Sequence, residues 1–266
     1  PGDPGECFTL SADAFDIADR LQTPVFVMSD LDIGMNDWVI DALQWDDSRR
    51  YDRGKVLDAD GLEAARDFAR YRDVDGDGIP WRTLPGTHPE KGAYFTRGTS
   101  HTDTGAYTED GTIHAATLDR INAKFKTAKR LVPPPVVRTL STKSRLGIIN
   151  YGSTEPAVRE ALALTMRDGH GLNHMRLRAF PFGREVIDFI ERHDFLFVVE
   201  QNRDAQMRQL LMVEAGASAE KLVPITNYDG LPLTADFIVN AVYAALEKNS
   251  LVAGASAPPI TTAQRD

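Results

Sequence analysis

Residues 146–168 read LGIINYGSTEPAVREALALTMRD. The opening apolar run, residues 146–150, is typical of a strand that is buried on both faces of a sheet. Ser153 and Thr154 can cap a helix, and Pro156 is tolerated in a first helical turn. The stretch therefore predicts a strand at 146–150 that is followed almost at once by a helix at 155–168.

The same alternation continues toward the C-terminus. Further strands are predicted at 175–180 (MRLRAF), 195–199 (FLFVV) and 222–226 (LVPIT), and further helices at 183–193, 204–215 and 234–248. Strands and helices that alternate with short connections indicate an α/β fold with a mostly parallel sheet. Ligand and partner contacts collect at the carboxyl ends of such strands. The small, polar residues 251–266 predict a disordered tail.

The N-terminal region predicts one more helix and one more strand. In the helix, at 6–22, the spacing of Phe8, Phe15, Ala18 and Leu21 puts them on one face. Thr23-Pro24 ends this helix, and the apolar run 25–28 predicts a buried strand whose carboxyl end is Ser29-Asp30. One strand cannot form a sheet, so we expect this piece to belong to a larger domain.

Residues 44–112 are rich in Asp, Arg, Gly and Thr and show little periodicity. So long an irregular stretch is usually functional or part of an interaction surface. A weak helix is predicted at 60–72 and a second at 112–130, the latter with a buried stripe of Ile113, Ala116, Leu118, Ile121 and Phe125. Consecutive prolines then predict a stiff linker at 132–140 between domains at 1–131 and 141–250.

Composition excludes several classes of protein. With 30 Lys and Arg against 39 Asp and Glu, the net charge is −9, which is opposite to that of a nucleic-acid-wrapping protein. No apolar run is long enough to span a bilayer. The single cysteine, Cys7, cannot form an internal disulfide or hold an iron–sulfur cluster alone, which favours a reducing, cytoplasmic setting. The chain begins Pro1-Gly2-Asp3, so we expect a fragment or a processed product.

Asp73, Asp75 and Asp77, with Gly78 after them, resemble the opening of a calcium loop. The pattern then fails, because Leu84 stands where a bidentate glutamate would close the site. The alternative is an Asp/Gly turn whose carboxylates cap backbone amides. We assign no metal ligands from the sequence and leave cation binding by this loop open.

Other polar residues allow both a functional and a structural interpretation. His88 and His101 are thirteen residues apart on loops, which matches no zinc pattern. They either serve proton transfer or contact an anion, or are solvated loop side chains. Glu200, Asn202 and Arg203 follow a strand and would contact a ligand or a subunit, or cap the next helix. The turn 152–154 would hold a phosphate or simply begin a helix. The residues alone therefore indicate an α/β chain without a self-sufficient catalytic constellation.

Several stretches resemble a known family. They are 22–38 (QTPVFVMSDLDIGMNDW), 71–101 (YRDVDGDGIPWRTLPGTHPEKGAYFTRGTSH), 197–207 (FVVEQNRDAQM) and 228–233 (YDGLPL). Together they are similar to the alpha subunit of 2-oxoacid:ferredoxin oxidoreductases, most of all the 2-oxoglutarate type with fused gamma and alpha parts. The resemblance runs in order from Pro1 to about Glu247.

The resemblance implies a fold and a chemistry. Residues 1–131 would be the last part of a thiamine-diphosphate pyrimidine-binding domain with an extension, and 141–250 a transketolase C-terminal-like domain. The family decarboxylates a 2-oxoacid on thiamine diphosphate and Mg²⁺, which alpha and beta subunits share. Coenzyme A takes the acyl group, and electrons pass through an iron–sulfur cluster on a partner chain to ferredoxin. The implied partners are a beta subunit, ferredoxin and further alpha/beta units.

The family's catalytic residues lie earlier in its alpha chain and have no counterpart here, so we carry over no catalytic residue and expect this stretch to be inactive alone. From strand-end and loop positions, we predict that Asp30, Arg97 and His101 lie near the active site. Two alternatives stay open. One is a transketolase-like or 2-oxoacid dehydrogenase beta-like subunit, and the other is a non-catalytic dimerisation scaffold.

Overall fold

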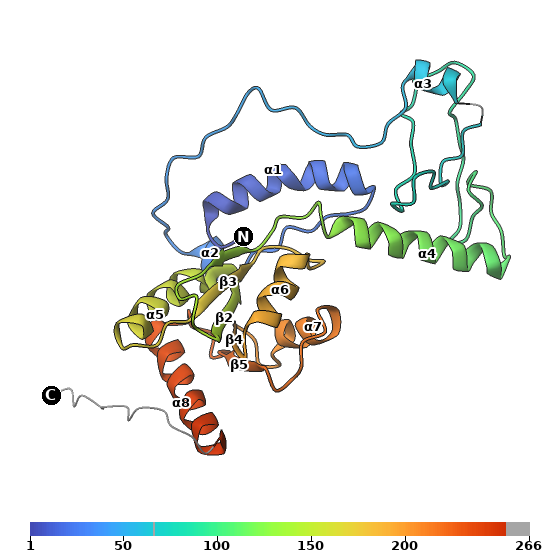
Figure 1. Cartoon of the computed structure of the whole chain (residues 1–266). Helices are drawn as coiled ribbons and strands as arrows, with labels where there is room; N and C mark the ends of the chain where they lie inside the picture. The colour runs from blue at the N-terminus through green and yellow to red at the C-terminus, as the bar shows by residue number, and fades with distance from the viewer. Residues whose placement is uncertain (66, 254–266) are drawn as a thin grey trace. The chain divides into compact units, whose positions relative to one another are not determined.

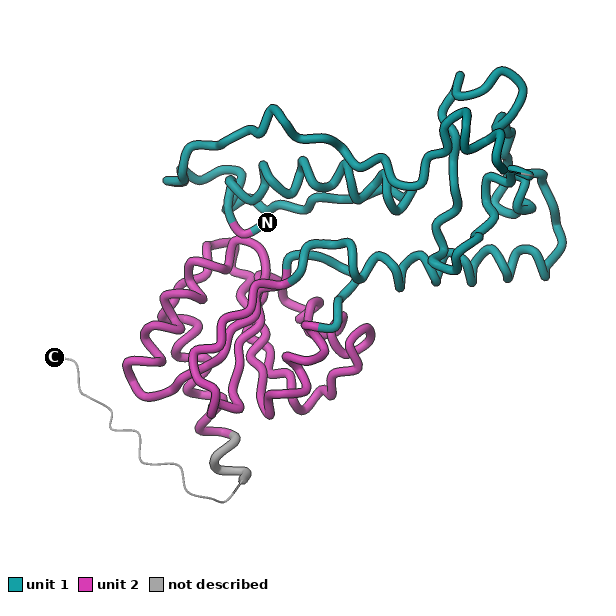
Figure 2. Tube along the Cα trace, turned by 45° about the horizontal axis from the view of Figure 1, so that its top comes forward, with its two compact units in different colours: residues 1, 3–134, 178–184 teal, residues 2, 135–177, 185–266 magenta. Residues whose placement is uncertain are grey.

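A computed structural model describes residues 1–65 and 67–253 of the chain (Figure 1). The chain divides into two compact units (Figure 2). Unit 1 comprises Pro1, Asp3–Pro134 and Arg178–Arg184, and unit 2 comprises Gly2, Pro135–Leu177 and the described residues from Glu185 onward. No helix in this part of the chain is both long enough and apolar enough to cross a bilayer.

Unit 2 is built on a five-stranded sheet in the order β1-β3-β2-β4-β5. Strands β2 (Leu146–Tyr151), β3 (Asn173–Leu177), β4 (Phe195–Glu200) and β5 (Leu222–Thr226) are parallel, and the short β1 (Val136–Arg138) joins β3 antiparallel at the edge. The predicted α/β fold with a mostly parallel sheet is therefore confirmed. β1 lies inside the stretch 132–140, where the prolines predicted only a linker.

Helices cover both faces of this sheet, as the continuous apolar runs predict. Figure 1 shows α5 (Glu155–Arg167) and α8 (Ala235–Ala253) on one side, and α6 (Arg184–Arg192) and α7 (Gln206–Glu214) on the other. Ile148, Phe197 and Ile238 belong to the core on the α5/α8 side. Gly147 faces the opposite side, where an added Cβ would lie 2.7 Å from Leu196 and 3.2 Å from Phe189 of α6. Successive residues of β2 thus contribute to two different cores.

Unit 1 contains α1 (Pro4–Leu21), α2 (Leu31–Met35), α3 (Ala59–Ala64) and α4 (Gly111–Ala128), joined by long irregular segments. Asp3 caps α1 by accepting from the Glu6 amide, and Asp110 caps α4. A small core of Ile17, Leu21, Ile79 and Ala128 holds α1, the segment around residue 79 and α4 together.

Three expectations for unit 1 are wrong. Residues 25–28 form no strand, and Phe26 and Met28 are 81% and 75% exposed, because no other strand of the described chain pairs with them. The helix expected at 60–72 is reduced to α3. The stripe expected to be buried on α4 is largely uncovered, with Leu118 and Phe125 each 48% exposed.

The buried face of α1, the bounds of β3 and the start of the tail also differ from the expected ones. The buried face of α1 is made by Leu10, Ile17 and Leu21, whereas Phe15 is 68% exposed. In unit 2, β3 begins and ends earlier than the predicted strand at 175–180. Of the expected tail 251–266, residues 251–253 belong to α8, and residues 254–266 lie outside the described residues.

Candidate functional site

Residues 73–79, which we call the aspartate loop, fold around their own carboxylates. Asp73 accepts hydrogen bonds from the amides of Gly76 (2.9 Å) and Gly78 (2.8 Å), and Asp77 accepts from the Ile79 amide (2.8 Å). Gly76 and Gly78 have φ values of +77° and +80°, a backbone conformation that residues other than glycine rarely adopt. The loop is therefore the Asp/Gly turn that the sequence analysis gave as one of two alternatives.

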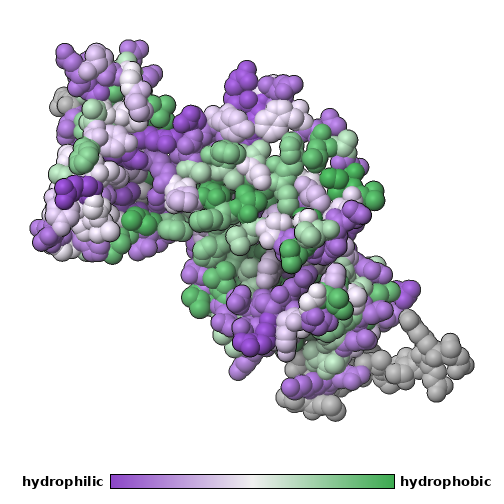
Figure 3. Space-filling view, turned by 180° about the vertical axis from the view of Figure 1, so that it is seen from behind, coloured by the Kyte–Doolittle hydropathy of each residue, from purple (hydrophilic) through white to green (hydrophobic). Residues whose placement is uncertain are grey.

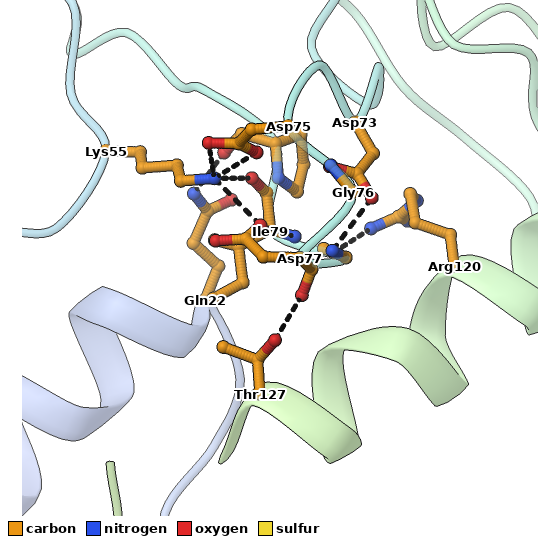
Figure 4. A network of polar contacts seen from close by, with 11 residues as sticks. Gln22, Lys55, Asp73, Asp75, Gly76, Asp77, Ile79, Arg120 and Thr127 are labelled. Atoms are coloured by element: carbon orange, nitrogen blue, oxygen red, sulfur yellow. Dashed lines mark hydrogen bonds and ion pairs between the residues drawn. The ribbon is translucent and has the colours of Figure 1, made fainter. Parts of the chain in front are cut away.

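Carboxylate oxygens of Asp73, Asp75 and Asp77 all lie within 4.8 Å of one another, as in a cation site. The ammonium of Lys55 points into this group (Figure 4). Its Nζ donates to both oxygens of Asp75 (2.6 and 2.8 Å), to Asp77 Oδ1 (2.8 Å) and to the carbonyl of Ile79 (2.9 Å). Lys55 thus supplies the positive charge that a bound cation would bring.

The charge state of Lys55 fits this geometry. Partial burial by itself lowers the pKa of the lysine, but the hydrogen bonds that its ammonium donates to Asp75 and Asp77 outweigh burial and raise the pKa above its usual value. Lys55 therefore stays protonated at neutral pH and contacts two of the three carboxylates with its single positive charge. Lys55 thus offsets part of the negative charge of the loop, and cation binding by the three aspartates stays a prediction.

The aspartate loop also fixes α4. Thr127 donates to the carbonyl of Asp77 (2.8 Å), and Arg120 Nη1 donates to the carbonyl of Gly78 (3.2 Å). Gly78 lies so close to the helix that an added Cβ would be 2.2 Å from the backbone nitrogen of Lys124. The position thus requires glycine both for its φ and for its close approach to α4.

His101 and Arg97 lie on the loops that precede α4. The His101 ring stacks against Tyr71 with centroids 3.9 Å apart, and its Nδ1 lies 3.0 Å from the carbonyl of Thr102. Arg97 lies over the ring of Tyr107 at 5.7 Å. The two predicted residues therefore share one region of unit 1.

Asp30 does not join them. Its carboxylate accepts from the Ile33 amide (3.0 Å) and so caps α2. Figure 1 shows α2 and the loops before α4 at opposite ends of unit 1. The structure thus separates Asp30 from the other two residues predicted near the active site.

His88 has a structural arrangement. Its Nε2 lies 2.7 Å from Glu63 Oε1, and its Nδ1 accepts from the amides of Glu90 and Lys91. With Nδ1 as acceptor, Nε2 is the donor to Glu63 of α3. Both ring nitrogens of His88 are therefore hydrogen-bonded within unit 1.

Glu200, at the end of β4, caps the next helix. The side chain is fully buried, and its oxygens accept from the amides of Met207 (2.7 Å) and Arg208 (2.9 Å) at the start of α7. Asn202 donates to Glu200 (2.8 Å) and accepts from the Gln206 amide. These contacts are those of the helix-capping alternative, and the interface role of both residues stays a prediction.

Arg203 and the turn 152–154 differ in exposure. The Arg203 side chain is 72% exposed and pairs with Asp204, so it is open to a partner. Ser153 and Thr154 are buried, and they bond to Gln201 and to the carbonyl of Tyr151. The turn therefore uses its hydroxyls within the protein.

A buried polar cluster of residues from β2, β3 and the start of α5 was not predicted from the sequence. His174 has no exposed surface, and its Nε2 lies 2.7 Å from Asn150 Oδ1 and 3.5 Å from Glu155 Oε2. Glu155 also pairs with Arg138 (2.9 Å) and lies 3.7 Å from Arg176. The signal was the polar pair Asn173-His174, which stands just before the start of the predicted strand.

Burial lowers the pKa of His174 to about 4; the nearby Glu155 opposes this, and Arg138 and Arg176 add to it. The imidazole is therefore neutral at pH 7. Because it has no exposed surface, its place in this structure is that of a structural hydrogen-bonding group.

Comparisons with known proteins bear on the fold. No family model matches the chain, and no curated protein sequence matches it either. A solved structure does, that of the 2-oxoglutarate:ferredoxin oxidoreductase from Magnetococcus marinus with 2-oxoglutarate, coenzyme A and succinyl-CoA bound. It superposes with a TM-score of 0.77 at 23% identity, over 92% of this chain and 41% of that one. The chain has the fold of the part of that structure with which it superposes.

The similarity to 2-oxoacid:ferredoxin oxidoreductases seen in the sequence is thus confirmed at the level of the fold. The chain spans less than half the length of the Magnetococcus marinus enzyme. Lower similarity links it to a split-gene transketolase, inactive beta4 tetramer (18% identity, 44% of this chain and 43% of that one, TM-score 0.37). The alpha chain of a probable 2-oxoacid ferredoxin oxidoreductase from Thermoplasma acidophilum follows (22% identity, 43% and 97%, TM-score 0.30).

Thiamine diphosphate would need donors for its diphosphate and ligands for Mg²⁺. At the carboxyl edge of the sheet, the groups of this kind, Ser153, Thr154, Glu155 and Glu200, bond to other side chains and to backbone of unit 2. The described residues at this edge therefore do not form a thiamine diphosphate site by themselves. We assign no chemical step to them.

Proposed function

We propose that the chain is the C-terminal part of the alpha subunit of a thiamine-diphosphate-dependent 2-oxoacid:ferredoxin oxidoreductase. The reaction would be oxidative decarboxylation of a 2-oxoacid to an acyl-coenzyme A, with electrons passed to ferredoxin. The proposed 2-oxoacid is 2-oxoglutarate. The observation that carries the proposal is the likeness of fold over 92% of the chain at a TM-score of 0.77.

The sequence adds independent support for this proposal. The four similar stretches occur in the order of the family's alpha subunit, and they lie in both units. The solved relative carries 2-oxoglutarate, coenzyme A and succinyl-CoA, which is why 2-oxoglutarate is the substrate proposed here. The single cysteine, Cys7, agrees with an iron–sulfur cluster on another chain.

The proposed role of this chain is to complete the assembly. Apolar side chains reach its surface in several places (Figure 3). The segment 26–45, which we call the apolar segment, exposes Phe26 (81%), Met28 (75%), Leu31 (79%), Met35 (77%) and Val39 (102%). Surfaces of this kind mark protein–protein contacts. A beta subunit or further alpha/beta units would cover it. Arg97 and His101 are proposed to lie near the active site of that assembly, and so is Asp30, although it lies apart from the other two within unit 1.

A second candidate is a non-catalytic dimerisation scaffold. It is favoured by the engagement of the polar groups at the sheet edge with one another, together with the exposed apolar segment. In this case the chain would bind a second copy of itself and have no part in electron transfer.

The native complex that contains this chain distinguishes the two. It is purified without oxygen and tested for reduction of a viologen dye that requires both a 2-oxoacid and coenzyme A. The proposal expects reduction and an iron–sulfur partner chain in the complex. A homo-oligomer without clusters and without reduction would contradict it and favour the scaffold.

A further inference from the structure

Three cations of unit 1 lie together beside the aspartate loop, and we call Arg70, Arg120 and Lys124 the cationic cluster. Arg120 and Lys124 are four residues apart on α4, so they share one face of the helix. Arg70 reaches the same place from the segment after α3, and the guanidinium carbons of Arg70 and Arg120 lie 4.9 and 5.8 Å from the centre of the Tyr71 ring.

Arg70 is unusual among the arginines of this unit. Its Nε and Nη1 are buried and have no hydrogen-bond partner among the described residues, and its guanidinium also lies 5.5 Å from the centre of the Tyr94 ring. By contrast, Arg49, Arg72 and Arg82 each pair with an aspartate at 2.9–3.0 Å. Buried donors without partners destabilise the folded state. Carboxylates that could pair with Arg70 are also plentiful, because acidic residues outnumber basic ones in this chain, 39 to 30. A guanidinium that contacts two aromatic rings but keeps two buried donors without an acceptor among the described residues points to an anionic partner outside them.

The members of the cluster also repel one another. Burial, and then Arg120 and Arg70, lower the pKa of Lys124, and burial, and then Arg70, lower the pKa of Arg120. Asp73 is the carboxylate that opposes the shift at Arg120, but its oxygens already accept from the Gly76 and Gly78 amides. The free chain therefore holds three like charges close together.

The cluster is held in place before any ligand arrives. Arg120 donates to the carbonyl of Gly78 (3.2 Å) and Lys124 donates to the carbonyl of Gln22 (3.2 Å). The close packing of Gly78 against α4 fixes the helix against the loop. Because these side chains are already ordered, a ligand would not have to order them on binding.

We propose that the cationic cluster is a binding site for an oxyanion of the phosphate class that carries at least two negative charges. A guanidinium presents parallel N–H donors that match two phosphate oxygens, and an ammonium adds a point charge. The anion would relieve the repulsion within the cluster. His101, which stacks on Tyr71, lies next to this site.

Inorganic pyrophosphate and inorganic phosphate are suitable probes. They are titrated into the full 266-residue chain, without divalent metal and with sodium chloride at matched ionic strength as the reference, by calorimetry and by thermal unfolding. The expected result is saturable binding and a rise in Tm, larger for pyrophosphate than for phosphate. A preference for pyrophosphate would indicate a linked diphosphate rather than a single phosphoryl group.

Substitutions locate the site. Arg70→Gln and Lys124→Gln should each weaken pyrophosphate binding at least tenfold, whereas Lys126→Gln, which removes an exposed charge from the same helix, should change it less than twofold. Without pyrophosphate, Lys124→Gln should have a Tm equal to or above that of the wild type, because one repelling charge is gone. A purely structural lysine would give a lower Tm.

Two results would overturn the proposal. The first is a pyrophosphate effect no larger than that of sodium chloride, and the second is equal binding by the Lys124→Gln and Lys126→Gln variants. If Arg70→Gln does not fold, Lys124→Gln decides alone. Absence of pyrophosphate binding, together with failure of Lys124→Gln to enter the native complex, would instead assign the cluster to an acidic side chain of another subunit.

Discussion

Lys55 Nζ lies 2.6 Å from Asp75 Oδ1 and 2.8 Å from Asp77 Oδ1, where a calcium loop would hold its ion. A loop that resembles a metal site in sequence therefore holds the ammonium of a residue eighteen positions before it. This pairing links the segment around residue 55 to the loop that fixes α4.

Replacement of Lys55 should expose the cation site. Lys55→Met removes the charge between the three carboxylates, so we expect a loss of about 1 kcal/mol in the free energy of unfolding, because Asp75 is half exposed. Calcium should then raise the Tm of the variant, while neither calcium nor a chelator changes the Tm of the wild type. Stabilisation of the wild type by calcium would show that the ion displaces Lys55.

Two glycines of the aspartate loop form a matched pair. Both have a positive φ, but an added Cβ at Gly76 would meet nothing within 4 Å, whereas at Gly78 it would clash with the backbone of α4. Gly76→Ala should cost about 1 kcal/mol of backbone strain, and Gly78→Ala about 3 kcal/mol or more. Urea unfolding measures both, and equal losses would show that α4 does not pack on the loop as described.

Glu200 should act on stability through α7. Its carboxylate accepts two amides of that helix, so Glu200→Gln should lower the free energy of unfolding by about 2 kcal/mol. Glu214→Gln, an exposed position in the same helix, is the control and should leave stability unchanged. A Glu200→Gln variant as stable as the wild type would return Glu200 to the predicted ligand or interface role.

Acidification should weaken unit 2 through His174. Its folded pKa of about 4 lies below the ordinary value of 6.5, so the unfolded chain binds the proton more readily. Above pH 6.5 His174 is neutral in both the folded and the unfolded chain and does not affect stability. As the pH drops from 6.5 to 4, the free energy of unfolding falls by at most about 3 kcal/mol. His193, whose pKa burial also lowers, acts in the same direction.

Urea unfolding at pH 7, 6 and 5 tests this dependence. The change of the free energy of unfolding with pH should be smaller for His174→Gln than for the wild type. It should be unchanged for His114→Gln, which alters an exposed histidine. An unchanged slope in His174→Gln would mean that the cluster around Glu155 admits a charged imidazole.

The apolar segment should matter for assembly and not for stability. Phe26→Ser and Val39→Ser remove side chains that are 81% and 102% exposed, so the Tm of the isolated chain should stay the same. Both variants should enter the native complex poorly, whereas Val213→Ser, 79% exposed in unit 2, should enter it normally. Normal assembly of all three variants would place the partner surface elsewhere.

The sheet of unit 2 could be predicted because its information is local. The apolar runs 146–150, 195–199 and 222–226 are strands within one residue of the expected bounds. Strand 173–177 was displaced because Asn173 and His174 are polar yet buried, and only their bonds to neighbouring elements explain that.

Unit 1 was harder to predict because many of its large apolar residues are exposed. Val25 to Met28 has the composition of a buried strand, but no strand of the described chain pairs with it. The ammonium at the aspartate loop and the unpaired Arg70 depend on residues far apart in sequence, so spacing alone could not indicate them.

The most direct test of the proposed function is a comparison of substrates on the native complex, purified without oxygen. Reduction of a viologen dye is followed with 2-oxoglutarate and with pyruvate, each with and without coenzyme A. Our account predicts reduction with 2-oxoglutarate that depends on coenzyme A and is much faster than with pyruvate. Reduction with neither 2-oxoacid would contradict the proposed function and leave a protein that shares only the fold of the oxidoreductase.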